Sequence, residues 1–132
     1  MSTADLDRSV DDDATLEADV FARACLSRPV LQTITGRWGG LVLAALGESP
    51  YRFSALRRRV DGVSERMLSQ TLQQLERDGF VHREVQETIP PKVEYSLTPR
   101  GEQVAERLLG LIDFVESQMP DILADQDRYD SR

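Results

Sequence analysis

Apolar side chains recur at intervals of three and four residues along most of the first two thirds of the chain. This spacing places them on one face of an α-helix, so it predicts amphipathic helices. The predicted helices cover residues 15–26, 29–36, 53–60 and 64–78. Residues 38–46 are apolar on nearly every side, which is typical of a buried helix, and we expect Gly47 to end it.

The pattern changes after residue 79. Residues 80–86 and 93–97 resemble two strands joined by a link that contains two prolines. Thr98 is suited to cap a last helix over residues 99–124, because Pro99 fits the first helical position. The order of elements predicts a mainly α-helical α+β fold with a small β-hairpin, namely a winged helix-turn-helix with N- and C-terminal dimerisation helices.

The chain of 132 residues fits one domain. We assign this domain to residues 15–125, between a disordered acidic tail at 1–14 and a flexible tail at 126–132. The sequence has no apolar run long enough to cross a membrane and no apolar block of a signal peptide. A cytoplasmic location without membrane contact is therefore expected.

The formal net charge of −7 is unusual for a protein that would bind DNA. The acidic residues gather at the ends: residues 1–19 carry seven acids and one arginine, and residues 113–132 carry six acids and two arginines. Residues 20–112 carry thirteen basic and ten acidic side chains, a net charge of +3. The central part can therefore approach an anionic partner.

Two short helices joined by a turn that contains glycine are typical of a helix-turn-helix. The turn is formed by residues 61–63, and Ser64 is suited to cap the second helix. Leu68, Leu72 and Leu75 face the core in this interpretation, together with Met67. The opposite face carries side chains that suit base edges in a major groove, because arginine pairs with guanine and glutamine with adenine. These are Arg66, Ser69, Gln70, Gln73 and Arg77.

The hairpin directly after this helix is predicted to be the wing. Arg83 lies near its base, and Lys92, the only lysine, lies near its tip. Cations on a stiff turn suit contacts with phosphate or the minor groove. The arginines at 57–59 have two alternatives, contact with phosphates or pairing with Asp61 and Glu65. The expected DNA-binding set is Arg57, Arg58, Ser64, Arg66, Ser69, Gln70, Gln73, Arg77, Arg83 and Lys92.

Several segments resemble HxlR-type winged-helix regulators, which are relatives of the MarR group. The segments are Gly36-Arg37-Trp38, residues 52–56, Gly62-Val63-Ser64, residues 68–79 and the run from Pro90 to Gly101. The resemblance implies a sequence-specific transcriptional regulator. Between repression and activation, which both stay open, we expect repression. It also implies a homodimer that binds double-stranded operator DNA through this fold, with the terminal helices at the dimer interface. The resemblance leaves the effector open between a small molecule and an oxidant.

The last helix carries an apolar band that is too wide for its own small domain to cover. We expect a homodimer through this band and the segment around residues 16–24. The expected interface residues are Val20, Leu108, Leu111, Ile112, Val115 and Met119.

The single cysteine, Cys25, rules out a disulfide within the chain. The resemblance implies a candidate sensor of oxidants or electrophiles at this position, although Leu26 stands where the family usually has proline. Arg23 and Arg28 beside it favour a reactive thiolate, whereas Phe21 and Leu26 favour burial and an inert thiol. Both alternatives stay open.

The sequence lacks the residue sets of the common catalytic classes. His82 has no accompanying cysteine cluster for a metal, and we see neither a nucleophile beside a base nor a glycine-rich phosphate loop. We therefore expect no enzyme activity, no cofactor and no metal. The alternative function is a winged helix that binds other proteins without binding DNA.

Overall fold

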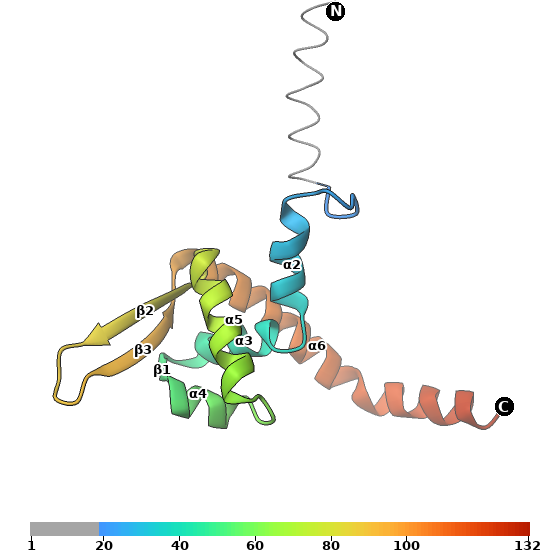
Figure 1. Cartoon of the computed structure of the whole chain (residues 1–132). Helices are drawn as coiled ribbons and strands as arrows, with labels where there is room; N and C mark the ends of the chain where they lie inside the picture. Colours follow the sequence, from blue (N-terminus) through green and yellow to red (C-terminus); the bar gives the residue numbers. More distant parts are fainter. Residues whose placement is uncertain (1–18) are drawn as a thin grey trace, which may run out of the picture.

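The computed structural model describes residues 19–132, and the predicted tail at 1–14 lies outside them. Figure 1 shows a group of short helices with a hairpin on one side and a long helix that leaves on the other. The helices are α2 (Ser27–Thr35), α3 (Gly39–Glu48), α4 (Phe53–Arg59), α5 (Glu65–Arg77) and α6 (Pro99–Asp130). The strands are β1 (Tyr51–Arg52), β2 (Val81–Gln86) and β3 (Lys92–Leu97). The predicted winged helix-turn-helix is confirmed.

Helix α3 lies at the centre of the core. Val42 and Leu43 are fully buried, and the helix contacts α2, α4, α5, α6 and β3. Leu68, Leu72 and Leu75 of α5 pack into the same cluster, and each is at most 1% exposed. Burial of a leucine side chain contributes roughly 1.5–3 kcal/mol. These three leucines therefore fix which face of α5 is turned outward.

The predicted starts of α5 and α6 are confirmed by their caps. Ser64 Oγ accepts a hydrogen bond from the Met67 backbone N–H at 3.1 Å, and Thr98 Oγ1 accepts one from Gly101 at 3.0 Å. Gly62 in the turn and Gly79 after α5 have φ values of 93° and 80°, which favour glycine. The chain therefore turns sharply on both sides of α5.

The sheet has three strands rather than the two of the predicted hairpin. Its order is β1-β3-β2 and both pairings are antiparallel. Tyr51 lies opposite Tyr95, so β1 covers one edge of β3 near the base of the wing. Strand β1 was not predicted, because two residues are too short to show an alternating pattern.

The helix predicted over residues 15–26 is wrong for its described part, because residues 19–26 form turns and a bend. The Asp19 carboxylate accepts a hydrogen bond from the Phe21 N–H at 3.1 Å, and such a local bond competes with helical pairing. Residues 15–18 lie outside the described part.

Two predicted helix ends are also wrong. Helix α3 continues through Gly47 to Glu48. A Cβ on Gly47 would lie 3.2 Å from the side chains of Ala105 and Leu109, so this glycine allows α3 and α6 to approach closely. Helix α6 continues to Asp130 instead of ending near residue 124, so residues 126–130 of the predicted tail are helical.

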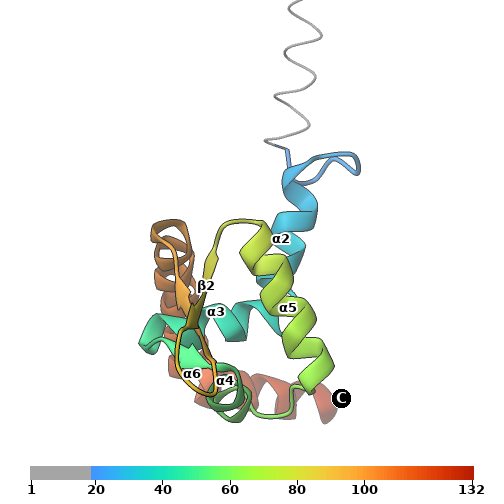
Figure 2. The ribbon, with the colours of Figure 1, turned by 60° about the vertical axis from the view of Figure 1, so that its left-hand side comes forward.

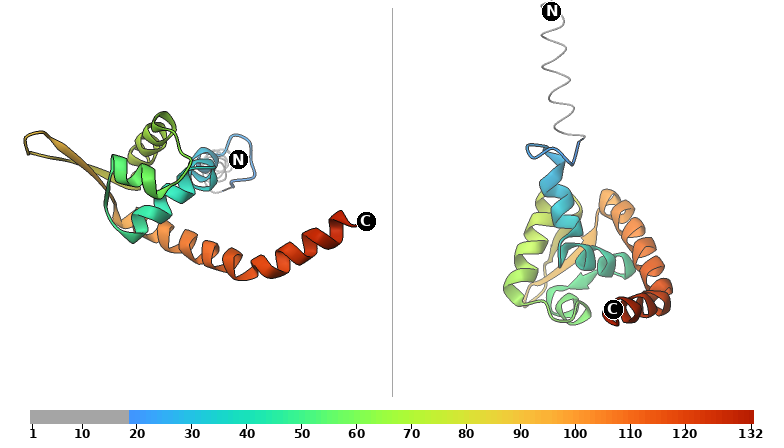
Figure 3. Two further views of the ribbon diagram at one scale, coloured as in Figure 1. Left: turned by 90° about the horizontal axis from the view of Figure 1, so that it is seen from below. Right: turned by 90° about the vertical axis from the view of Figure 1, so that its right-hand side faces the viewer.

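The second half of α6 extends away from the other helices (Figures 1 and 3). Pro120 lies inside this helix, which bends along its length in Figure 3, and proline cannot donate the usual helical hydrogen bond. Among residues 19–132, no helix is both long and apolar enough to span a bilayer.

Candidate nucleic-acid interface

Helices α4 and α5 and the turn between them form the helix-turn-helix. Arg57 of α4 donates from Nε to the Val63 carbonyl oxygen at 3.4 Å, which connects α4 to the turn. Val60 and Val63 are buried beneath the turn, whereas Arg58 is exposed. The hydroxyl oxygen of Ser64 accepts the capping bond, so this residue already has a structural role.

The outward face of α5 carries the predicted base-reading side chains. Arg66, Gln70, Gln73 and Arg77 are exposed, and Ser69 is half-buried. Gln73 Nε2 donates to Ser69 Oγ at 3.4 Å, which holds the Gln73 amide along the helix surface. Figure 2 shows the wing to one side of α5, with α2 above and behind the upper part of α5. Met67 is 40% exposed, so its predicted place in the core is wrong.

The two predicted cations of the wing lie on opposite faces of the β-ribbon. Arg83 pairs in register with Tyr95, and Lys92 pairs with Gln86 at the end nearest the tip. Positions 83 and 92 belong to different alternating sets of this antiparallel pair, so their side chains point to different sides. Arg83 shares its face with Val81 and Val85, whereas the face of Lys92 also carries Glu84 and Glu94, which pair directly.

Arg59 pairs with Glu48, which corrects the expected partners Asp61 and Glu65 for this arginine. Arg59 Nε and Nη2 each donate to a Glu48 carboxylate oxygen at 2.7 Å. These hydrogen bonds from Arg59 lower the pKa of Glu48, and Glu48 raises the pKa of Arg59. The pair joins the ends of α3 and α4, which are eleven positions apart in the chain.

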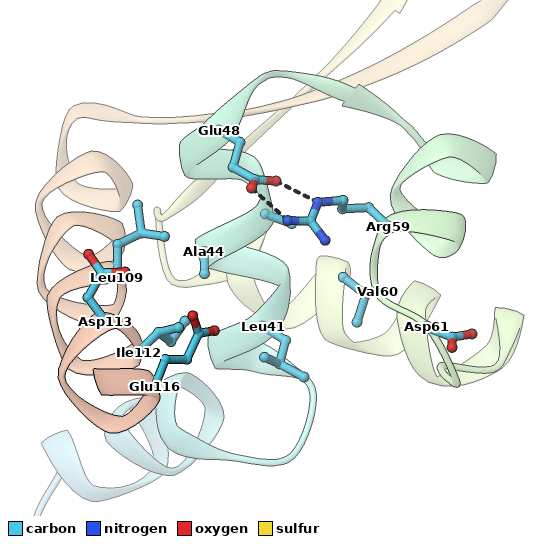
Figure 4. A pocket seen from close by; sticks show the side chains of 11 residues that line it. Leu41, Ala44, Glu48, Arg59, Val60, Asp61, Leu109, Ile112, Asp113 and Glu116 are labelled. Carbon is cyan, nitrogen blue, oxygen red and sulfur yellow. Dashed lines mark hydrogen bonds and ion pairs between the residues drawn. The ribbon is translucent and has the colours of Figure 1, made fainter. Parts of the chain in front are cut away.

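The Glu48–Arg59 pair borders a hollow of about 400 Å³ between α3, α6 and the end of α4 (Figure 4). We call it the acidic pocket, because its lining includes four carboxylates and one cation. The charged residues are Glu48, Asp61, Asp113, Glu116 and Arg59. Leu41 and Ile112 contribute apolar surface. The lining of the pocket therefore carries more negative than positive formal charge.

A second hollow of about 490 Å³ lies between α2, the turn that follows it, and α5. We call it the α5 groove. Its lining is Gln32, Thr33, Gly36, Arg37, Trp38, Gly39, Met67, Gln70, Thr71 and Gln74. Arg37 is the one charged side chain among these lining residues, and sequence reasoning did not include it in the DNA-binding set. The sequence feature that could have indicated Arg37 is its position inside the Gly36-Arg37-Trp38 motif.

Cys25 is 3% exposed and lies just before α2. Its Sγ atom lies 2.9 Å from Ser27 Oγ. Arg23 is exposed and Arg28 is half-buried. The thiol is therefore almost completely shielded from solvent in this arrangement.

The predicted dimer residues fall into two groups. Leu111 and Val115 are 59% and 42% exposed, whereas Leu108, Ile112, Met119 and Val20 are half-buried. Leu108 packs against the core and Ile112 lines the acidic pocket. Phe114 and Leu123, which the sequence reasoning omitted, are 62% and 52% exposed. They widen the apolar band of α6.

Comparisons with known proteins agree on one fold family. Residues 33–122 match the model described as HxlR-like helix-turn-helix. The chain is 53% identical over 111 residues to the HTH-type transcriptional regulator YtfH of Escherichia coli, covering 84% of this chain and 88% of that protein.

Two solved structures extend the comparison. The transcriptional regulator ytfH of Salmonella typhimurium is 50% identical, with a TM-score of 0.77 over 83% of this chain and 97% of that one. The oxidised form of the redox regulator HypR is 39% identical, with a TM-score of 0.64 over 70% of this chain and 96% of that one.

Proposed function

The chain belongs to the HxlR-like helix-turn-helix family, and we propose that it binds operator DNA as a homodimer with α5 in the major groove. It is a DNA-binding transcriptional regulator of the helix-turn-helix type. The finer assignment, to binding at an operator, rests on the resemblance of its motifs to the family. We propose repression rather than activation as its output.

One observation supports the proposal that α5 lies in the major groove. Its three leucines are buried while Arg66, Gln70, Gln73 and Arg77 are all exposed, with the wing beside them. Arginine and glutamine can each form two hydrogen bonds to a base edge in the major groove. Lys92, near the tip of the wing, is suited to a phosphate contact that positions the protein without reading sequence.

The test is binding to a duplex selected from a randomised library and to a scrambled duplex of the same length. The wild type should prefer the selected duplex, and Gln73→Ala should lose about 1–3 kcal/mol on that duplex only. Equal losses on both duplexes would contradict base reading by Gln73. Failure of the wild type to bind either duplex at low salt would instead support the alternative of a protein-interaction module.

The homodimer is supported by the exposed apolar band of α6, which includes Leu111, Phe114 and Val115. Light scattering should give twice the chain mass for the wild type and a smaller mass for Leu111→Asp. Glu106→Asp is a conservative control at an exposed position of the same helix. A stable wild-type monomer at micromolar concentration would contradict the proposal.

We further propose that oxidants act on the regulator through Cys25. The similarity to the redox regulator HypR favours this. The thiol is 3% exposed, so an oxidant must first gain access to it. With no second cysteine in the chain, the product would be an interchain disulfide, a mixed disulfide or an adduct. Diamide or a quinone should lower operator affinity of the wild type and leave Cys25→Ser bound. An identical response of both proteins would identify Cys25 as a packing residue.

A further inference from the structure

The turn between α2 and α3 is pressed against the end of α2. A Cβ on Gly36 would lie 2.7 Å from the Gln32 carbonyl oxygen, and a Cβ on Gly39 would overlap the Thr33 carbonyl oxygen. Side chains larger than hydrogen are therefore excluded on both sides of Arg37 and Trp38. The backbone that carries these two residues is held close to α2.

Arg37 is held over the ring of Trp38. Its guanidinium carbon lies 4.9 Å from the ring centroid, which is within the range of a cation–π contact. The Trp38 ring reaches the turn before α5, because a Cβ on Gly62 would lie 3.6 Å from its Cη2 atom. Arg37 is therefore connected through Trp38 to the helix-turn-helix, while its own side chain stays exposed.

The α5 groove has the chemistry of a site for one phosphate of a nucleic-acid backbone. Arg37 provides a positive charge, and no carboxylate is among the lining residues. The amides of Gln70 and Gln74 and the hydroxyl of Thr71 line the α5 side. Gln74 Nε2 already donates to the Asp78 carboxylate at 3.2 Å. Beside Arg37, the side-chain donors that α5 leaves for a phosphate are therefore those of Gln70 and Thr71.

We infer that the α5 groove receives the DNA backbone that borders the major groove, and that Arg37 contacts a phosphate there. This inference rests on the proposed function, since Gln70 belongs both to the groove and to the expected base-reading face. Charge complementarity and continuity with α5 identify the occupant. The Gly36-Arg37-Trp38 motif then has a physical role, since its glycine and tryptophan place the arginine beside α5.

The experiment measures the salt dependence of binding for the full chain with the selected and scrambled duplexes. Arg37→Gln should weaken binding to both by a similar, several-fold factor. It should also reduce the slope of log affinity against log salt by about 0.9 for each phosphate that the arginine no longer neutralises. Arg37→Lys should keep the slope, because it keeps the charge.

Arg107→Gln is the matched control. Arg107 is exposed on α6 and donates to the Gln103 carbonyl oxygen of its own helix, so its substitution should leave the slope unchanged. The inference is overturned if Arg37→Gln behaves like this control. It is also overturned if the Gln and Lys variants weaken binding equally, which would indicate packing on Trp38, or if only the selected duplex is affected. If the wild type binds neither duplex, the proposed function itself fails.

Discussion

The acidic pocket and the α5 groove are similar in size and opposite in charge. The pocket beside α6 has four carboxylates and one arginine, which is paired with Glu48. The groove beside α5 has one arginine and no carboxylate in its lining, and the two share no residue. The net charge of −7 therefore says little about which side an anion can approach. The local distribution of charge determines which side an anion can approach.

The largest effect is expected from adding a negative charge to the groove. Gln70→Glu keeps the size of the side chain but places a carboxylate beside Arg37 and the base-reading face. DNA affinity should fall by about 1–3 kcal/mol, which is roughly 5- to 150-fold. Fluorescence anisotropy measures it, with Gln103→Glu on the exposed surface of α6 as the control. An equal fall for both variants would mean that a negative charge on α6 weakens DNA binding as much as one in the α5 groove.

The wing should show a smaller effect. Lys92→Ala should weaken binding to all duplexes alike and lower the salt slope by about 0.9 for each wing, because a phosphate contact carries no sequence information. Arg83→Ala should change the slope less, since Arg83 lies on the other face of the ribbon, opposite Tyr95. Titrations at several salt concentrations distinguish the two. A larger slope change for Arg83 would place DNA on that other face.

Removing charge from the acidic pocket should hardly change DNA affinity. We expect the double substitution Asp113→Asn and Glu116→Gln to alter it by less than about twofold, because screening at moderate salt weakens the interaction between separated exposed charges. The same anisotropy titration measures it. A rise of about tenfold would mean that DNA approaches the α6 side.

The smallest effect concerns the Glu48–Arg59 pair. The pKa of Glu48 is lowered by hydrogen bonds from Arg59, so the pair stabilises the fold above the ordinary pKa of 4.5 and loses this contribution as the pH falls through the lowered value. Thermal melts should show Glu48→Gln slightly less stable than wild type at neutral pH. The difference should shrink in acid. If the difference in stability between the two proteins were the same at neutral and at acid pH, the charge of Glu48 would not be its cause.

Sequence patterns predicted the parts of the fold that local chemistry determines. Ser64, Thr98 and Gly79 act at single positions through caps and a positive φ, so the ends they define could be read from the sequence. Strand β1 depends on pairing with β3, and Gly47 depends on contact with α6. Both are set by residues distant in the chain, which a local pattern does not contain.

The candidate site also has one part that local sequence determines and another part that depends on residues distant in the chain. The outer face of α5 follows from helical spacing alone, and its exposure agrees with that prediction. Arg37 was omitted because it precedes α5 by a long stretch of chain and comes beside it only when α2 packs against α5. Arg59 was given acidic partners near in sequence, whereas folding brings it to Glu48.

DNA is expected to lie against α5 and away from the acidic pocket, and directed cleavage tests this placement. In a Cys25→Ser background, a DNA-cleaving chelate can be attached to Glu76→Cys on α5 or to Glu116→Cys beside the pocket, since both positions are exposed. We predict strand cleavage from position 76 in two clusters about one helical turn (~34 Å) apart, and none from position 116. Cleavage from position 116, or its absence from position 76 in a variant that still binds, would contradict this placement.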